Sequence, residues 1–154
     1  MSTLPSGLPE EVGDEEILVR FAFSRSRDLW LVSPPERLKP PALYPDKRYT
    51  PLETSVFRHS GQPEEELLRL AAKNFPDREV KGAGAFKVSD LRRLSQSDPL
   101  EVKADEKAPN GPRHANIIGW KSTSDPKNQK ADWKLQVGKL AGCSKIVWLL
   151  DESS

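Results

Sequence analysis

Apolar residues recur at every second position in several short stretches of this chain, a period typical of β-strands. In residues 17–23, Ile17, Val19, Phe21 and Phe23 fall on one face, and the other face is partly apolar as well. We therefore expect this strand to lie inside a sheet that is covered on both faces. Further strands are predicted at residues 54–58, 80–88, 100–104, 115–120 and 146–150.

Two stretches have the spacing of an amphipathic helix instead. Residues 63–76 begin and end with proline and carry glutamates in the first turn, where the helix dipole favours them. Residues 127–140 form the second helix, and its buried face is expected to contain Trp133, Val137 and Leu140. A shorter helical turn is predicted between the third and fourth strands.

Prolines are concentrated in two stretches that show neither period. Residues 1–14 combine proline and glycine with acidic side chains, so we expect a disordered and dispensable leader. Residues 33–51 contain six prolines, which forbid a helix and remove donors from any strand. Interleaved aromatic residues predict an ordered arm there. The chain is thus divided into a leader at 1–14 and a single domain at 15–151.

The order of these elements mixes strands and helices without a regular alternation, which predicts an α+β fold. We expect a single domain with a mixed sheet of about five or six strands, two main helices and the long proline-rich arm. The last helix joins the strands at 115–120 and 146–150. A crossover of this kind would make those two strands parallel neighbours.

The composition excludes several kinds of site. A single cysteine, Cys143, rules out an internal disulfide and a cysteine-based zinc site, and we expect it to be buried. Gly82 and Gly84 lack the spacing of a phosphate-binding loop and instead indicate a bulge or a close approach. We predict neither a metal nor a cofactor. The chain has no secretory signal and no apolar stretch of the roughly 20 residues that span a membrane, so we expect a cytoplasmic protein.

Charge is distributed unevenly along the chain. Residues 1–70 carry a net charge of −3 and residues 71–154 a net charge of +4. Between Lys107 and Lys145 there are eight basic and only two acidic residues. This segment is either a solvated helix face or a surface that contacts phosphates, so a nucleic-acid-binding module is one alternative function. Its candidate contacts are Arg113, Trp120, Lys121, Lys127, Lys130 and Lys134.

The chain has two histidines, His59 and His114, and an arginine precedes each. Histidine titrates near neutral pH and suits acid–base catalysis, while arginine binds phosphate or carboxylate. A small acid–base enzyme using both histidines is a second alternative, although each histidine could equally brace a strand. The weak catalytic candidates are His59, His114, Arg58, Arg113, Tyr49 and Asn116.

The main functional hypothesis is an accessory or adaptor protein that binds a protein partner. The proline-rich arm offers aromatic side chains on a stiff backbone, and interfaces favour such anchors. No catalytic motif competes with this interpretation, so an enzymatic role ranks below both binding roles. The candidate partner-binding residues are Trp30, Tyr44 and Tyr49.

Four short motifs also suggest a family. They are Ser55-Val56-Phe57-Arg58, Asp90-Leu91-Arg92, His114-Ala115-Asn116-Ile117-Ile118-Gly119-Trp120 and Lys139-Leu140-Ala141. With them the chain resembles, over most of residues 17–150, a loose group of small uncharacterised bacterial proteins with a Ser-Val … His-Ala-x-Ile-x-Gly pattern. It departs from that pattern at Leu43, where the group has phenylalanine. The resemblance implies a bacterial source and one compact domain, and it transfers no catalytic residue.

Overall fold

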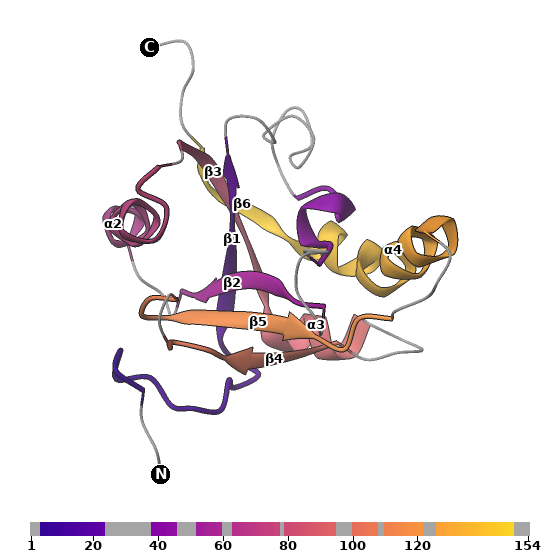
Figure 1. Cartoon of the computed structure of the whole chain (residues 1–154), viewed down its shortest axis with the longest axis horizontal. Helices are drawn as coiled ribbons and strands as arrows, with labels where there is room; N and C mark the ends of the chain where they lie inside the picture. Colours follow the sequence, from indigo (N-terminus) through magenta and orange to yellow (C-terminus); the bar gives the residue numbers. More distant parts are fainter. Residues whose placement is uncertain are drawn as a thin grey trace.

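The computed structural model describes residues 4–23, 38–45, 52–59, 63–77, 79–94, 100–107, 110–121 and 126–149. Within them the chain forms one six-stranded sheet, three α-helices and a short 3-10 helix, η1 (Figure 1). The elements in chain order are β1 (Ile17–Phe23), η1 (Pro40–Leu43), β2 (Thr54–Arg58), α2 (Glu64–Asn74), β3 (Val80–Lys87), α3 (Val88–Leu94), β4 (Glu101–Ala104), β5 (His114–Ile118), α4 (Pro126–Cys143) and β6 (Lys145–Leu149).

The sheet has the strand order β4-β5-β2-β1-β3-β6, which confirms the α+β class with six strands. Each of its five strand pairs is antiparallel, so within the described residues the sheet is not mixed in direction. The crossover prediction is wrong, because β5 pairs with β2 and β4 whereas β6 pairs with β3. Helix α4 therefore leads the chain from one half of the sheet to the opposite edge.

Alternation of side chains along each strand divides the buried residues between two hydrophobic cores, one on each face of the sheet. In β2, Val56 belongs to the core with η1, α3 and α4, and Phe57 belongs to the core with α2. Leu70 and Ala71 are the contribution of α2 to the second core. Figure 1 shows α2 on one side of the sheet and α3, α4 and η1 on the other. The prediction that β1 is covered on both faces is confirmed.

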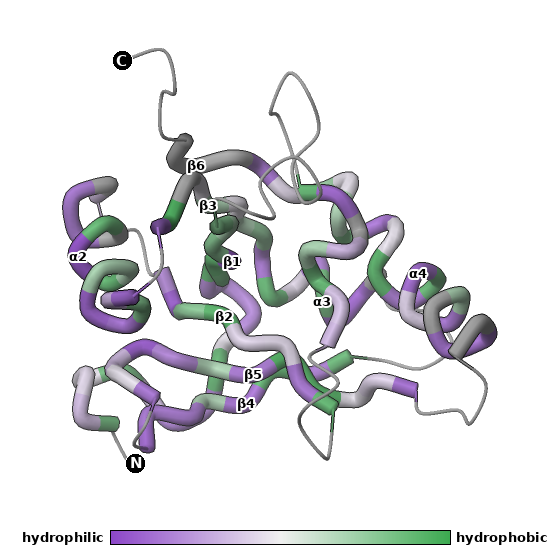
Figure 2. Tube along the Cα trace, turned by 45° about the horizontal axis from the view of Figure 1, so that its top comes forward, coloured by the Kyte–Doolittle hydropathy of each residue, from purple (hydrophilic) through white to green (hydrophobic). Residues whose placement is uncertain are grey.

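Helix α4 buries the face that its sequence predicts. Trp133, Val137 and Leu140 are at most 1% exposed. The tube in Figure 2 shows hydrophobic residues recurring between hydrophilic ones along α4. Cys143, at the end of this helix, is exposed, which contradicts the expectation that it is buried. Among the described residues, no helix is both long and apolar enough to cross a membrane.

The described part of the arm, residues 38–45, packs into the core. Leu38, Ala42 and Leu43 are each at most 1% exposed. A Cβ atom added at Gly84 of β3 would lie only 2.4 Å from Cγ of Leu38. Gly84 thus allows the arm to approach the sheet, and the register of β3 with β6 shifts beside it. Both features agree with the bulge or close approach that the glycines indicate.

The N-terminal segment, residues 4–16, is packed against the domain, which differs from the disordered leader expected at 1–14. Val12 is only 5% exposed and belongs to the core shared with α3 and α4. The hydroxyl of Ser6 donates to Glu106 Oε2 at 2.6 Å. Composition misled the prediction because one buried valine and several polar contacts hold a stretch that has no hydrophobic period.

Candidate functional site

The first candidate site is a polar cluster on the α2 side of the sheet, where β2 and β5 pair. The register places Phe57 opposite His114 and Ser55 opposite Asn116. His114 is buried, and its Nε2 lies 2.5 Å from Oγ of Ser55. Its Nδ1 lies 2.9 Å from the carbonyl oxygen of Asp105. A carbonyl only accepts hydrogen bonds, so Nδ1 carries the proton and Nε2 accepts from the serine hydroxyl.

Burial sets the protonation of this cluster. It lowers the pKa of His114, against the opposing effect of the Asp105 carbonyl, so the imidazole is neutral at pH 7. Asn116 donates from Nδ2 to Oδ2 of Asp105 at 3.2 Å. Burial also raises the pKa of Glu53, and the charge of Asp105 adds to this effect. The cluster therefore combines a neutral base, a hydroxyl and the carboxyl groups of Glu53 and Asp105.

Arg58 has a structural environment rather than that of a catalytic residue. Its side chain is fully buried, and Nε and Nη2 donate to the two carboxylate oxygens of Glu16 at 2.6 Å each. Nη1 donates to the carbonyl of Pro9 at 2.6 Å. The guanidinium nitrogens of Arg58 thus all donate to groups inside the protein. This contradicts the expectation that Arg58 binds a phosphate or carboxylate of a substrate.

No hydrogen bond among the described residues links His59 to His114. Arg113 adopts a positive φ of 69° and donates from Nη1 to the carbonyls of Arg58 and His59. Burial lowers the pKa of His59, with a further effect from Arg113. Among the described residues, the buried Nδ1 of His59 has no hydrogen-bond partner. Nε2 of His114 instead hydrogen-bonds to Ser55, which no sequence pattern marked as a candidate site residue.

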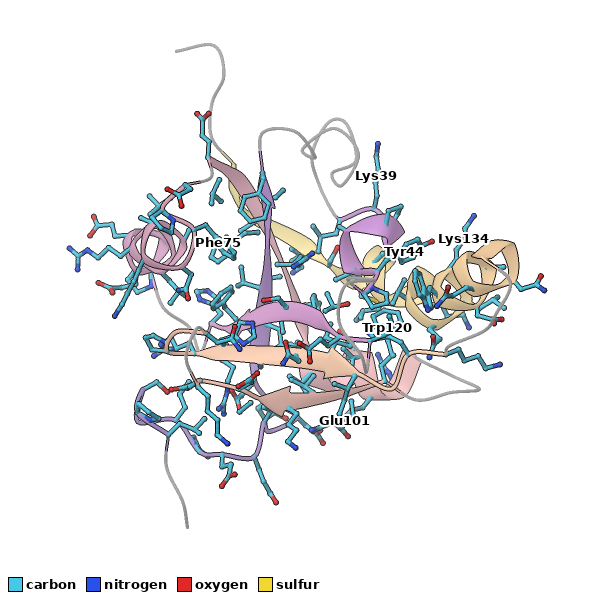
Figure 3. All side chains as sticks on the ribbon, viewed as in Figure 1. Lys39, Tyr44, Phe75, Glu101, Trp120 and Lys134 are labelled. Atoms are coloured by element: carbon cyan, nitrogen blue, oxygen red, sulfur yellow. The ribbon has the colours of Figure 1, made fainter. Side chains whose placement is uncertain are left out.

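The described part of the basic segment keeps lysines at the surface but buries Trp120. Trp120 is 8% exposed, and its Nε1 donates to the Ile117 carbonyl at 3.1 Å. Its ring packs against Trp133, so it is not available to stack on a base, which corrects that prediction. Lys121 and Lys134 are exposed, and Figure 3 shows Lys134 pointing away from the domain. Lys127 and Lys130 lie on α4, but their side chains are outside the described part of the chain.

In the described part of the proline-rich arm, the aromatic residue packs against the domain instead of pointing into solvent. Tyr44 is half-buried, and its ring centroid lies 5.7 Å from that of Trp133. Figure 3 shows Tyr44 between η1 and α4. Trp30 and Tyr49, the other two predicted anchors, lie outside the described residues.

A second candidate site is an open groove of about 960 Å³ between the N-terminal segment and β4. Figure 1 shows this segment running beside β4, which forms one edge of the sheet. No sequence pattern indicated the groove, because the groove arises from the packing of a segment expected to be disordered. Its lining residues are Pro9, Glu10, Glu11, Val12, Gly13, Asp14, Arg92, Glu101, Val102 and Lys103.

Arg92 holds the two walls of the groove together. Its guanidinium forms ion pairs with Asp14 on one wall and with Glu101 on the other, and it donates to the Val12 carbonyl at 2.8 Å. These bonds raise the pKa of Arg92, led by the one to Glu101. Because Arg92 is occupied in this way, the exposed carboxylates of Glu10 and Glu11 dominate the charge of the groove.

No protein-family model, no curated protein and no solved structure matches this chain. Within the described residues, no group of three or more histidine, cysteine, aspartate or glutamate side chains is arranged to hold a metal ion.

Proposed function

We propose that this protein is an accessory or adaptor protein that binds a protein partner. The groove between residues 9–14 and β4 is the observation that carries the proposal. The described part of the arm is packed inward, so we assign partner binding to the groove rather than to Tyr44. A nucleic-acid partner has weaker support, because Trp120 is buried and the groove is rich in carboxylates.

The shape of the groove favours an extended segment of the partner. One wall is strand β4 at the edge of the sheet, and the other is a stretch of non-helical chain. Val102 on β4 donates its backbone N–H to Oε1 of Glu101 at 2.9 Å. An incoming strand can replace this side-chain acceptor with a backbone carbonyl, as in other cases of strand addition to a sheet edge.

The charge of the groove selects a basic segment. Glu10 and Glu11 are exposed at its rim, and Arg92 already pairs with Asp14 and Glu101. Of the basic side chains that line the groove, only Lys103 is left to offset the glutamates. A partner segment with lysine or arginine at alternate positions complements this surface, whereas an acidic segment is repelled.

Fluorescence anisotropy with labelled octapeptides tests the proposal. A peptide of alternating threonine and lysine should bind with a Kd on the order of 10–100 µM at low salt. The same length of alternating threonine and glutamate should not bind. The double variant Glu10→Lys/Glu11→Lys should reverse this preference. The preference should weaken as salt is added, because the charges are exposed.

The matched control changes two exposed carboxylates that lie outside the groove. The double variant Glu65→Lys/Asp77→Lys alters the net charge equally and should leave the preference for the basic peptide intact. If this control abolishes binding as fully as the groove variant, attraction to overall charge explains the result. If neither peptide binds the parent protein at millimolar concentration, the proposal is wrong.

A further inference from the structure

Ser55 and His114 have the mutual geometry of a nucleophile and its general base. The hydroxyl of Ser55 donates to Nε2 of His114 at 2.5 Å. The carbonyl of Asp105 accepts from Nδ1 at 2.9 Å and fixes both the tautomer and the orientation of the ring. In serine nucleophiles activated by histidine, a third group orients the base in the same way. Here a backbone carbonyl takes the place of the usual carboxylate.

The surroundings of the pair keep the base ready to accept a proton. His114 packs edge-on against Phe57, with ring centroids 5.3 Å apart, and is buried. This burial lowers the pKa of His114 and keeps Nε2 unprotonated at pH 7. Ser55 is only half-buried, and it lies on the strand face that β2 shares with β5. The hydroxyl group is therefore placed between a buried base and the partly open face of the sheet.

A row of polar residues crosses the three strands at this point. The register places Ser55 of β2 opposite Asn116 of β5, and Asn116 opposite Lys103 of β4. Asn116 is buried and bonded to Asp105, whereas Lys103 is exposed. A substrate lying along the row would meet the hydroxyl at one end and a cation at the other. The row thus suits an ester that carries a negative charge near its acyl group.

We propose that Ser55 and His114 act together to hydrolyse carboxylic esters. Ser55 Oγ forms a bond to the acyl carbon while its proton passes to Nε2 of His114. The ester C–O bond breaks, and the departing alcohol takes that proton. Water then attacks the acyl carbon, gives a proton to Nε2 and releases the acid, and the proton returns to Ser55 Oγ. The overall reaction consumes one ester and one water.

Labelling with diisopropyl fluorophosphate tests the pair without knowledge of the natural ester. Intact-protein mass spectrometry should show one diisopropylphosphoryl group, and peptide mapping should place it on Ser55. Ser55→Ala should abolish the adduct. Ser6→Ala is the matched control, because Ser6 also has a short hydrogen bond, to Glu106, but no histidine partner. This control should label as the parent does.

His114→Asn tests the base separately from the nucleophile. Asparagine keeps a donor near the position of Nδ1 but has no counterpart of Nε2, so the labelling rate should fall by about a hundredfold. Thermal unfolding checks that the variant is folded. In the parent, the rate should rise with pH to a plateau, with a midpoint below pH 6.5 because burial lowers the pKa of His114. Asp105 and Glu106 raise this midpoint, and Arg20 lowers it.

A cysteine variant keeps the proposal testable if His114→Asn does not fold. In Ser55→Cys the new thiol lies beside the base and should react with iodoacetamide at least about tenfold faster at pH 7 than the exposed Cys143 of the same molecule. Equal rates at the two cysteines would overturn the proposal. It would also be overturned if the folded parent gave no fluorophosphate adduct, or if folded His114→Asn labelled at the parental rate.

Discussion

Arg58 has no exposed side-chain surface, so its charge depends on acceptors that the protein supplies. Glu16 provides both carboxylate oxygens, and the carbonyls of Pro9 and Glu11 complete the shell. A buried charge without such partners is strongly destabilising. One residue of β2 thereby holds both the N-terminal segment and the turn that precedes β1.

Replacing this arginine tests its structural role. Arg58→Met should lower the free energy of unfolding by about 3 kcal/mol or more, because Glu16 would keep a partly buried charge with no partner. Urea denaturation measures the change. Arg69→Met is the control, since its ion pair with Glu66 is 74% and 41% exposed, and it should cost no more than about 0.5 kcal/mol. Similar losses in the two variants would contradict the role assigned to Arg58.

Glu16 should make the protein sensitive to acid. Burial raises the pKa of this carboxyl, but Arg58 and the Gly13 amide outweigh it and bring the pKa below the ordinary value of 4.5. The folded state therefore binds the proton more weakly than the unfolded chain does. The stabilisation is complete above that ordinary value and is lost as the pH falls through the lower pKa of the folded state.

The corresponding experiment follows the free energy of unfolding from pH 6 to pH 3. The parent should be more stable than Glu16→Gln at pH 6, and the difference should shrink below pH 4.5. Glu15 is exposed and provides the control. Glu15→Gln should leave the free energy of unfolding between pH 3 and pH 4.5 close to that of the parent. A constant difference between the parent and Glu16→Gln across this range would show that Glu16 does not act through its charge.

At the scale of elements, the hydrophobic period predicted where strands and helices lie but not which strands pair. The period places a residue on a face of the sheet, whereas pairing depends on contacts between distant segments. For this reason β6 was expected beside β5 but pairs with β3. The same contrast between local pattern and long-range pairing applies to the polar cluster around His114. His114 was a candidate from its chemistry alone, and only the pairing of β2 with β5 brings Ser55 within hydrogen-bond distance of it.

Helix α4 offers a direct test of the larger core. Trp133 is 1% exposed, its Nε1 donates to the Lys121 carbonyl at 2.9 Å, and it packs against Tyr44 and Trp120. Trp133→Ala should therefore cost about 3 kcal/mol or more in denaturation experiments. Leu135→Ala, on the same helix and at a side chain 77% exposed, is the control. A small effect at Trp133 would place that face at the surface.

At the scale of the whole molecule, the N-terminal segment is part of the folded domain. Its composition predicted disorder, but Val12 is buried and the carbonyls of Pro9, Glu11 and Val12 accept bonds from Arg58 and Arg92. Backbone carbonyls can accept such hydrogen bonds whatever side chain the residue has. The composition of the segment therefore does not predict these bonds. This packing also creates the groove on which the proposed function depends.

Removing the segment should therefore be costly. A chain that begins at Asp14 loses the burial of Val12 and leaves Arg58 short of acceptors, so its Tm should fall by about 5–10 °C. Glu10→Ala, which alters only an exposed side chain of the segment, should keep the Tm within about 1 °C. An unchanged Tm after truncation would show that the segment does not contribute to the folded state.

The most direct test of partner binding is an NMR titration of ¹⁵N-labelled protein with the threonine–lysine octapeptide. If a partner segment binds in the groove, the backbone amides of residues 10–14 and of β4 should shift progressively, while those of α2 on the other side of the sheet should not. Shifts centred on α4 or on the proline-rich arm, or no shifts at millimolar peptide, would contradict the proposal that a protein partner binds in this groove.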